Sequence, residues 1–354
     1  MTGTTTGSGS GAGSGTKALT AAIIGYGRNG STMHAGPLEA LEDFKVIAVC
    51  DIDADARKKA QDRFSCPVYE DYKHLLAAEK PDLTVIVTRS HQHSPMAVDC
   101  LRAGRNVLVT KPWALNAEGG RAMIAASKAS GAMLLPWLPA RWGTDLTRLK
   151  ELVASGAVGK VFQIRRSVST FGIRHDWQTQ KDCGGGYLLN WGPHIVDQPV
   201  QLSGSPVRSA YARMKQVINP GDVEDHFYGV LETENGTIIQ VEHNIAAPGM
   251  FDWVVQGDRG TIYVRNGTEL ELHRVSFPEN FDPASYRNPV AIAVTKETLG
   301  SRIYGDELEI YRHIARALRK QEPYAVAPES ALMLSMELDA IRASSASGEA
   351  VRIG

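Results

Sequence analysis

The chain has 354 residues, of which 43% are hydrophobic and 22% are charged, and its formal net charge is −1. This length is more than one domain needs at about 150 residues each, so we expect two domains. The near-neutral charge, with lysine and arginine spread along the chain, argues against nucleic acid as a partner. No apolar stretch in the sequence approaches the length of a membrane span, so we expect no membrane association.

The start of the chain and its cysteines indicate where the protein works. Residues 1–17 are mostly glycine, serine, threonine and alanine, a composition that predicts a flexible tail. This segment lacks the basic start and apolar centre of a secretory signal, which predicts a cytoplasmic protein. Cys50, Cys66, Cys100 and Cys183 form no CxxC pair, which argues against a zinc site or a disulfide framework.

Residues 18–137 alternate short apolar runs with helical patterns, which is typical of βαβ units. We expect strands at 20–24, 46–51, 83–88, 106–109 and 132–135, with helices between them that include 55–64 and 93–104. This order predicts a doubly wound parallel sheet, the Rossmann architecture. In such a sheet ligands bind beyond the carboxyl ends of the strands.

A glycine-rich loop follows the first predicted strand and carries the most specific motif of the chain. Its sequence is Gly25-Tyr26-Gly27-Arg28-Asn29-Gly30, and Asp51 ends the next apolar run. The glycines allow a tight turn, close approach of the backbone to a pyrophosphate, and close packing of the following helix on the strand. Asp51 stands where a ribose hydroxyl needs an acceptor, which favours NAD over NADP, although Arg57 leaves NADP possible. Asp51 as an ordinary turn residue is the alternative interpretation.

Residues 138–354 form the second predicted domain, which we expect to bind substrate and to mediate oligomerisation. Alternating patterns predict a large, mostly antiparallel open sheet with strands at 161–170, 209–217, 224–233, 237–244, 253–256, 261–264 and 269–275. Asn235-Gly236 and Asn266-Gly267 carry a hairpin signal. Helices are expected at 145–155, near Tyr187, at 306–320 and at 330–345. One face of this sheet needs a cover, so we expect a homodimer or homotetramer.

Two groups of polar residues are candidates for chemistry. Lys111 precedes Pro112 at the carboxyl end of a predicted central strand, where partial burial would lower its pKa toward acid–base use. The second group is the face formed by Asn190, His194 and Asp197, at helical spacing after a glycine run. A surface lysine and a structural histidine are the alternative interpretations.

These motifs resemble the Gfo/Idh/MocA family, which includes glucose-fructose oxidoreductase and inositol dehydrogenase, from about residue 18 to the end of the chain. The resemblance implies oxidation or reduction of sugars, cyclitols and related polyols with NAD or NADP. It matches Lys111 to the lysine of a Glu-Lys-Pro motif and His194 to a histidine in a glycine-rich helix motif. It also places Thr88 and His93, together with Lys111 and Pro112, beside the nucleotide.

The chain departs from the family pattern at two positions. Thr110 stands in place of the motif glutamate, and Asn190 stands in place of an aspartate four residues before His194. An amide orients a hydroxyl but cannot take its proton. We therefore assign the proton to His194, which ordinarily titrates near neutral pH, with Lys111 polarising the reacting oxygen, Asn190 positioning the substrate and Asp197 orienting His194.

Other polar and aromatic residues are weaker candidates. Arg141, Trp142, His175 and Trp177 are expected to line the substrate pocket, and Trp113 is a further candidate; each also suits plain packing. His91 and His93 lack a clear third ligand, so we predict no metal.

The leading hypothesis is an NAD-dependent dehydrogenase that acts on a secondary hydroxyl of a sugar, glycoside or cyclitol. Two alternatives remain: a glycosidase that oxidises and re-reduces its substrate with a retained cofactor, and a non-catalytic dinucleotide sensor. Lys111 and His194 argue against the sensor.

Overall fold

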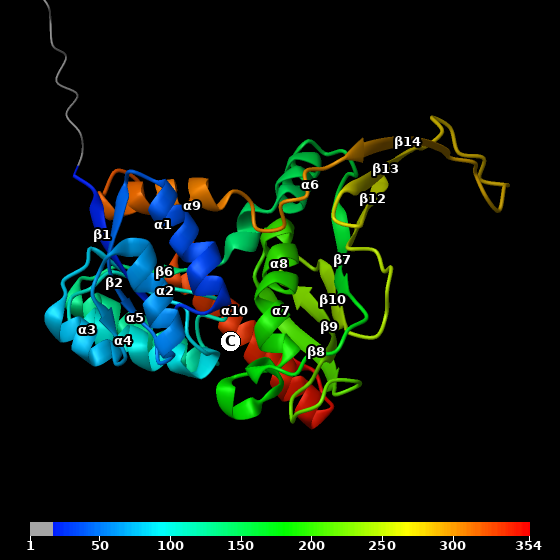
Figure 1. Cartoon of the computed structure of the whole chain (residues 1–354). Helices are drawn as coiled ribbons and strands as arrows, with labels where there is room; N and C mark the ends of the chain where they lie inside the picture. The colour runs from blue at the N-terminus through cyan, green and yellow to red at the C-terminus, as the bar shows by residue number, and fades with distance from the viewer. Residues whose placement is uncertain (1–16) are drawn as a thin grey trace, which may run out of the picture.

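The computed structural model describes residues 17–354, so the predicted tail lies outside the described residues except for Lys17. Residues 19–136 form a parallel sheet in the order β3-β2-β1-β4-β5-β6 (Figure 1). Its strands are β1 (Leu19–Ile24), β2 (Phe44–Cys50), β3 (Val68–Tyr69), β4 (Leu83–Ile86), β5 (Val107–Val109) and β6 (Leu134–Pro136). The strand order reverses between β1 and β4, which places a ligand-binding crevice at their carboxyl ends. The Rossmann prediction is confirmed.

Helices connect these parallel strands, and side-chain caps mark where several of them begin. Asp53 accepts hydrogen bonds from the backbone N–H groups of Asp55 and Ala56, and Asn116 accepts one from Gly119. The connecting helices are η1 (Gly30–His34), α1 (Ala35–Ala40), α2 (Ala54–Phe64), α3 (Tyr72–Ala78), η2 (Ser90–Gln92), α4 (His93–Arg102) and α5 (Ala117–Ser130).

Residues 161–352 contribute the strands of a nine-stranded sheet in the order β14-β13-β12-β11-β7-β10-β9-β8-β15. Every pairing in it is antiparallel except that of β7 with β10. Its strands are β7 (Val161–Ser169), β8 (Val207–Lys215), β9 (His226–Thr233), β10 (Ile238–Asn244), β11 (Trp253–Gly257), β12 (Gly260–Arg265), β13 (Glu269–Ser276), β14 (Ala291–Thr298) and β15 (Val351–Arg352). The mostly antiparallel prediction is confirmed, but β14 and β15 were not predicted.

Helices cover one face of this larger sheet (Figure 1). Before and between the strands lie η3 (Pro139–Trp142), α6 (Thr144–Ala154), η4 (Trp177–Thr179), η5 (Lys181–Cys183), α7 (Tyr187–Ile195) and α8 (Asp197–Ser203). Both Asn-Gly hairpins are confirmed: Asn266 and Gly267 take positive φ values of 52° and 67° between β12 and β13, and Gly236 takes 85° between β9 and β10.

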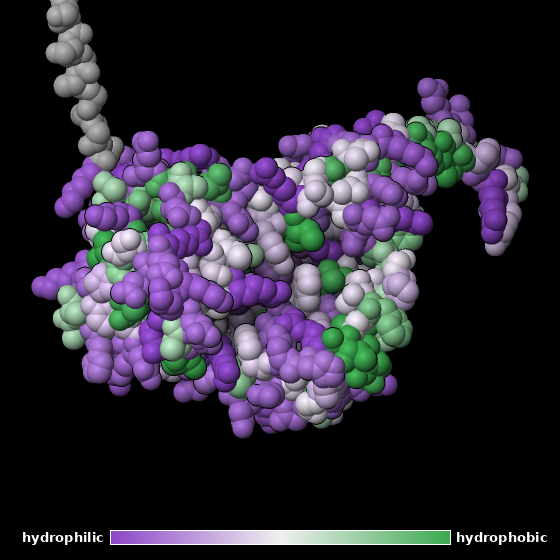
Figure 2. All heavy atoms as spheres, viewed as in Figure 1, coloured by the Kyte–Doolittle hydropathy of each residue, from purple (hydrophilic) through white to green (hydrophobic). Residues whose placement is uncertain are grey.

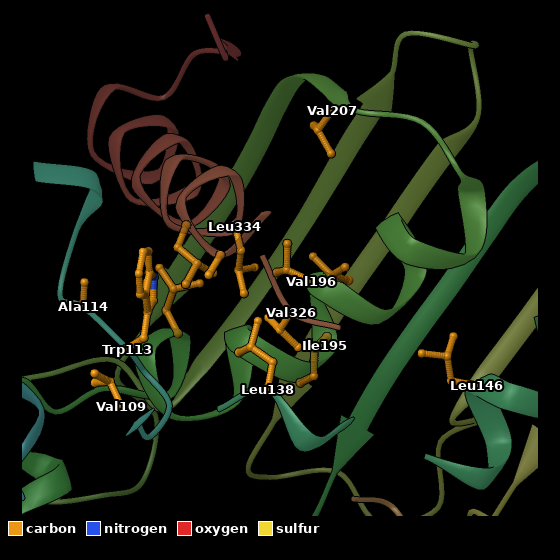
Figure 3. Packing of buried hydrophobic residues seen from close by; sticks show 14 of the residues in the cluster. Val109, Trp113, Ala114, Leu138, Leu146, Ile195, Val196, Val207, Val326 and Leu334 are labelled. Atoms are coloured by element: carbon orange, nitrogen blue, oxygen red, sulfur yellow. The ribbon is translucent and has the colours of Figure 1, made fainter. Parts of the chain in front are cut away.

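The last two helices, α9 (Glu307–Leu318) and α10 (Pro328–Ser347), return to the Rossmann sheet. Tyr311 of α9 is fully buried beside Trp137, and its hydroxyl lies 2.8 Å from His34 Nδ1. Trp113, from the turn after β5, donates a 2.8 Å hydrogen bond to Ser335 Oγ of α10 and packs near Leu334 (Figure 3). These contacts hold the two sheets on either side of the crevice.

Two general properties bear on the sequence predictions. In the part of the chain that the structure describes, no helix combines the length and the apolar character that crossing a bilayer requires. All four cysteines are buried and free.

Candidate active site

The glycine loop forms a cradle at the carboxyl end of β1. Gly25 has a φ of +96°, and a Cβ there would lie 2.6 Å from the Val87 carbonyl oxygen, whereas a Cβ on Gly30 would lie 2.1 Å from the Gly25 carbonyl oxygen. A Cβ on Gly27 would meet nothing within 4 Å. The first and third glycines are therefore required by the protein itself, and the second leaves open backbone that a phosphate group can approach.

Asp51 lies beside this cradle at the end of β2. Its carboxylate accepts hydrogen bonds from the Tyr26 and Asp53 backbone N–H groups, at 2.6 and 2.9 Å, and it lines the same cavity as the glycine loop. Arg57 is directed elsewhere: its guanidinium donates to the Asp51 and Ile52 carbonyl oxygens, at 2.8 and 3.0 Å. Among residues 17–354 no guanidinium therefore pairs with the Asp51 carboxylate, and its free lone pairs suit the hydroxyl groups of an adenosine ribose.

One cavity of about 780 Å³ connects the cradle to the second domain, a volume within the usual range for a ligand site. Asp51 and Tyr72 line one end of it, and Lys111, Trp177 and Asn190 line the other. The other predicted cofactor contacts that also line it are Gly25, Gly27, Arg28, Asn29, Thr88, His93 and Pro112. The residues present thus fit a dinucleotide, with an acceptor for the ribose and open backbone for the pyrophosphate.

Lys111 follows β5 and contacts Asn190 of α7 in the lining of this cavity. The Lys111 amine donates to the Asn190 backbone oxygen and to its Oδ1, both at 2.8 Å. Burial lowers the pKa of Lys111 to about 7, with further lowering by the positive charges of Arg174 and Arg28. The structure therefore brings together two of the predicted catalytic residues and gives the lysine a pKa suited to proton exchange at neutral pH.

His93 fixes the turn that carries Lys111. Its Nδ1 lies 2.6 Å from the Pro112 carbonyl oxygen and its Nε2 lies 3.0 Å from the Thr88 carbonyl oxygen. The ring is thereby held between two backbone carbonyl oxygens, and the nitrogen that carries the N–H donates to one of them. Among residues 17–354 no group of three histidine, cysteine, aspartate or glutamate side chains is arranged to hold a metal.

His194 is buried behind Asn190, with 1% of its surface exposed. Neither ring nitrogen has a hydrogen-bond partner among the described residues. Burial holds the pKa of His194 well below its usual range, and the charges of Lys111 and Arg166 lower it further. The expectation that His194 titrates near neutral pH is therefore wrong, because a buried cationic ring would have no acceptor among the described residues.

Asp197 does not orient His194, which corrects a second expectation. The two residues fall on successive helices, α7 and α8, and the Asp197 carboxylate forms a bidentate pair with Arg141 at 2.8 and 2.6 Å. Arg141 also donates to Ser330 Oγ at 2.8 Å. This ion pair is buried, so both side chains serve packing beneath the site.

Of the aromatic residues that were predicted to line the substrate pocket, some line the cavity and others lie elsewhere. Trp177 lines the cavity, whereas His175 is exposed and is not among the described lining residues. Trp142 packs near His313 and Tyr324 instead. Trp113 is 2% exposed and serves the interdomain core.

Two residues near the reaction centre escaped the sequence reasoning. Arg174 lines the cavity, pairs with Asp176 at 2.5 Å and acts on Lys111 through its charge. Tyr304, between β14 and α9, places its ring centroid 5.1 Å from that of His194. Arg174 adjoins the predicted pocket segment around His175, but Tyr304 lies far from every motif and gave no local signal.

Comparisons with known proteins agree with this geometry. A family model described as "Oxidoreductase family, NAD-binding Rossmann fold" matches residues 19–136, and a "GFO/IDH/MocA C-terminal domain" model matches residues 146–263. The chain is 31% identical over 255 residues to the uncharacterized oxidoreductase YdgJ of Escherichia coli, and the match covers 72% of each protein.

Two further relatives extend the match over almost the whole chain. The scyllo-inositol 2-dehydrogenase (NADP(+)) IolW of Bacillus subtilis is 24% identical over 335 residues, which cover 91% of this chain and 92% of the relative. The crystal structure of GenD2 from gentamicin A biosynthesis, in complex with NAD, gives a TM-score of 0.80 at 25% identity, over 96% of this chain and 97% of that chain. The chain therefore belongs to the Gfo/Idh/MocA family, and it is an NAD-binding oxidoreductase.

Proposed function

We propose that this protein interconverts a secondary hydroxyl and a ketone on a sugar, glycoside or cyclitol, with NAD as the cofactor. The observation that carries the proposal is the Lys111 amine, held 2.8 Å from Asn190 Oδ1 in the cavity that also contains the glycine cradle. When bound, the nicotinamide supplies the hydride acceptor or donor. The protein's part is to position the hydroxyl and to exchange its proton.

The preference for NAD rests on Asp51 and Arg57. A carboxylate at the end of β2 accepts hydrogen bonds from the ribose hydroxyls and repels a 2′-phosphate. Arg57, the nearby cation, is held by two backbone carbonyl oxygens and by Glu70 at 3.4 Å. IolW bears NADP in its name, so both cofactors belong in the test.

The substrate end of the cavity suits a polyol. Lys111 and Asn190 present a donor and an amide to a hydroxyl group, and Trp177 presents an aromatic surface to the apolar face of a sugar ring. Gln178 adds a further amide in the lining. The name of one relative contains scyllo-inositol, a six-membered carbon ring that carries a hydroxyl group on each carbon. This name supports a polyol as the substrate.

The first test measures NADH formation with NAD and, separately, with NADP against a panel of inositols, aldoses, sugar acids and glycosides. We expect turnover with NAD, lowered by about 10²–10⁴-fold in Lys111→Ala because a positioned acid–base group contributes that much. The His194→Ala variant should also lose activity. The Asn280→Asp variant, changed at an exposed residue, serves as the folded control.

Two outcomes would contradict the dehydrogenase. Cleavage of a glycoside without net NADH, abolished by Lys111→Ala, would indicate a glycosidase with a retained cofactor. Tight NAD binding with no turnover on any substrate would indicate a dinucleotide sensor.

A further inference from the structure

The charged side chains that line the cavity are separated by sign. In the sheet order β3-β2-β1-β4-β5, the segments after β3 and β2 bring carboxylates to the cavity, whereas those after β1, β4 and β5 bring basic side chains. The carboxylates are those of Glu70, Asp71, Asp51 and Asp53, and the basic side chains are those of Arg28, Arg89 and Lys111. Because the carboxyl ends of parallel strands lie along one edge of the sheet, the cavity has an acidic half, which includes the predicted ribose acceptor, and a basic half.

The second domain adds one more cation to the basic half. Arg174 lies in the loop before η4 and lines the cavity, and its positive charge contributes to lowering the pKa of Lys111. Among the described lining residues, Asp176 is the one carboxylate of this half. Four basic side chains therefore accompany a single carboxylate there. A cleft with such an excess of one sign concentrates ligands of the opposite sign.

Arg174 is held in place by its neighbours but keeps donors free. Its backbone N–H donates to Oδ1 of the buried Asn219, at 2.9 Å. Its Nε and Nη2 donate to the two carboxylate oxygens of Asp176, at 3.1 and 2.5 Å. Nη1 makes no hydrogen bond to any of residues 17–354. A guanidinium has five N–H donors, so Asp176 orients Arg174 and leaves N–H groups for a second anion.

A bound dinucleotide would leave most of the basic half without a counter-ion. Its pyrophosphate belongs at the glycine loop, which is also the segment that carries Arg28. Lys111 and Arg174 lie at the substrate end, and Arg89 contacts Cys183 Sγ at 3.7 Å. A neutral sugar would leave these side chains without an anion, whereas a carboxylate or a phosphate accepts charge-assisted hydrogen bonds from a guanidinium.

We propose that the substrate carries an anionic group, a carboxylate or a phosphate, and that Arg174 is the residue that binds it. The inference rests on the proposed function and narrows its substrate from sugars and cyclitols in general to their acids or phosphate esters. Lys111 and Asn190 remain free to contact the hydroxyl that reacts. Arg174 therefore determines which substrate binds and takes no part in the hydride transfer.

The first experiment measures binding without turnover. The protein is saturated with NADH, which occupies the pyrophosphate site and cannot oxidise an alcohol. Calorimetry then compares glucose with glucuronate and glucose 6-phosphate, the matching galactose series, and myo-inositol with myo-inositol 1-phosphate. We expect at least one anionic member to bind about tenfold or more tightly than its neutral parent, because hydrogen bonds between charged groups are the stronger ones. The tighter anion identifies the group as a carboxylate or a phosphate.

The second experiment removes the charge of Arg174. Arg174→Gln, which retains an amide donor, should weaken binding of the tighter anion by about 10–100-fold and leave its neutral parent unchanged. Arg174→Lys, which keeps the charge but loses the planar fork, should weaken the anion less. Arg121→Gln removes the same charge from an exposed position of α5 and should change neither ligand.

The third experiment tests Arg174 during turnover. For each substrate pair, kcat/KM of the anionic member is divided by kcat/KM of the neutral member at one pH, so that any effect of Arg174 on Lys111 cancels. Arg174→Gln should lower this ratio by about 10–100-fold, mainly through KM. In the wild type, an increase in NaCl from about 0.05 M to 0.5 M should also lower the ratio, because salt screens charges.

Three results would overturn the inference: anionic members that bind no better than their neutral parents, an Arg174→Gln variant that weakens both members equally, or an anion that competes with NADH and so occupies the glycine loop. Turnover of neutral sugars without preference for anions would also overturn it, but would leave the proposed function intact. Anion-selective binding that depends on Arg174, without turnover of any substrate, would overturn the proposed function and support the anion site.

Discussion

At the scale of single residues, the fold requires two of the three glycines in the glycine loop, whereas the third is explained only by a bound ligand. Gly25 and Gly30 have no room for a side chain, because a Cβ would lie 2.6 and 2.1 Å from backbone carbonyl oxygens. Gly27 has no protein atom within 4 Å of its Cβ position. Its small size has no structural reason within the described chain, which leaves approach of the cofactor as the reason.

A methyl group at Gly27 should therefore weaken cofactor binding while leaving the fold intact. We expect Gly27→Ala to retain the wild-type melting temperature and to bind NAD at least about tenfold more weakly, because its Cβ obstructs the pyrophosphate. Gly36→Ala, on α1 and also free of contacts within 4 Å, is the matched control and should change neither property. Both quantities come from calorimetry, and unchanged NAD affinity in Gly27→Ala would exclude close approach at this loop.

At the scale of elements, the Arg141–Asp197 pair joins η3 to α8 beneath the site. Their side chains are 10% and 3% exposed, and the bidentate contact leaves little surface for a substrate. Glu337 of α10 is also buried nearby, and burial, followed by the charge of Asp197, raises the pKa of Glu337 well above its usual range. Arg141 also donates to Ser330 Oγ of α10, so the pair joins segments from both ends of the second domain.

Removal of one partner should destabilise the protein rather than impair substrate binding. Asp197→Asn leaves a buried guanidinium without its carboxylate, which should cost about 3–5 kcal/mol of unfolding free energy. Breaking the half-exposed Arg148–Glu297 pair with Arg148→Gln should cost at most about 1 kcal/mol. Urea denaturation compares the two variants. An unchanged midpoint together with a raised KM would instead assign Arg141 to the substrate pocket.

The helices, strands and turns that were predicted correctly are those whose sequence signal lies within the element itself. The buried strand β4, the capped helix α2 and the Asn-Gly turns each carry their signal within a few residues. Errors arose where distant segments decide the outcome. Arg141 and Asp197 are 56 residues apart, and only the packed fold shows that each is the other's partner. The depressed pKa of His194 likewise depends on burial, which its helix motif does not encode.

At the scale of the whole molecule, one face of the nine-stranded sheet has no cover from the described residues. Helices α7, α8 and α10 pack against the other face (Figure 1). Tyr211 pairs across strands with Val230, which pairs with Gln240, and the alternate residues Ala212 and Val241 are fully buried. The loop 277–290 and β14 extend this sheet as an arm that stands clear of the body (Figure 2).

We propose that a second copy of the chain covers this outer face as a homodimer or homotetramer, because most soluble oligomers are symmetric and bury matching surfaces. Light scattering at micromolar concentration should give a mass of two or four times 38.4 kDa. Val230→Glu should shift the mass toward one chain, because association would then bury a charge. Gln61→Glu, at an exposed position of α2 in the Rossmann domain, adds the same charge away from this sheet and should leave the mass unchanged, and a wild-type monomer would contradict the proposal.

The return of α9 to the Rossmann sheet has a consequence for how the protein is made. Ile310, Tyr311 and Ile314 share a buried cluster with Ile23 and Val85 of the central strands. When the ribosome has translated the Rossmann segment, the chain still lacks α9, which supplies part of the buried core of that domain. Because domains generally fold as units during synthesis, this domain cannot complete its core until α9, residues 307–318, has been translated. Chaperones would therefore bind a nascent chain in which the glycine loop is already translated but the core beneath it is still incomplete.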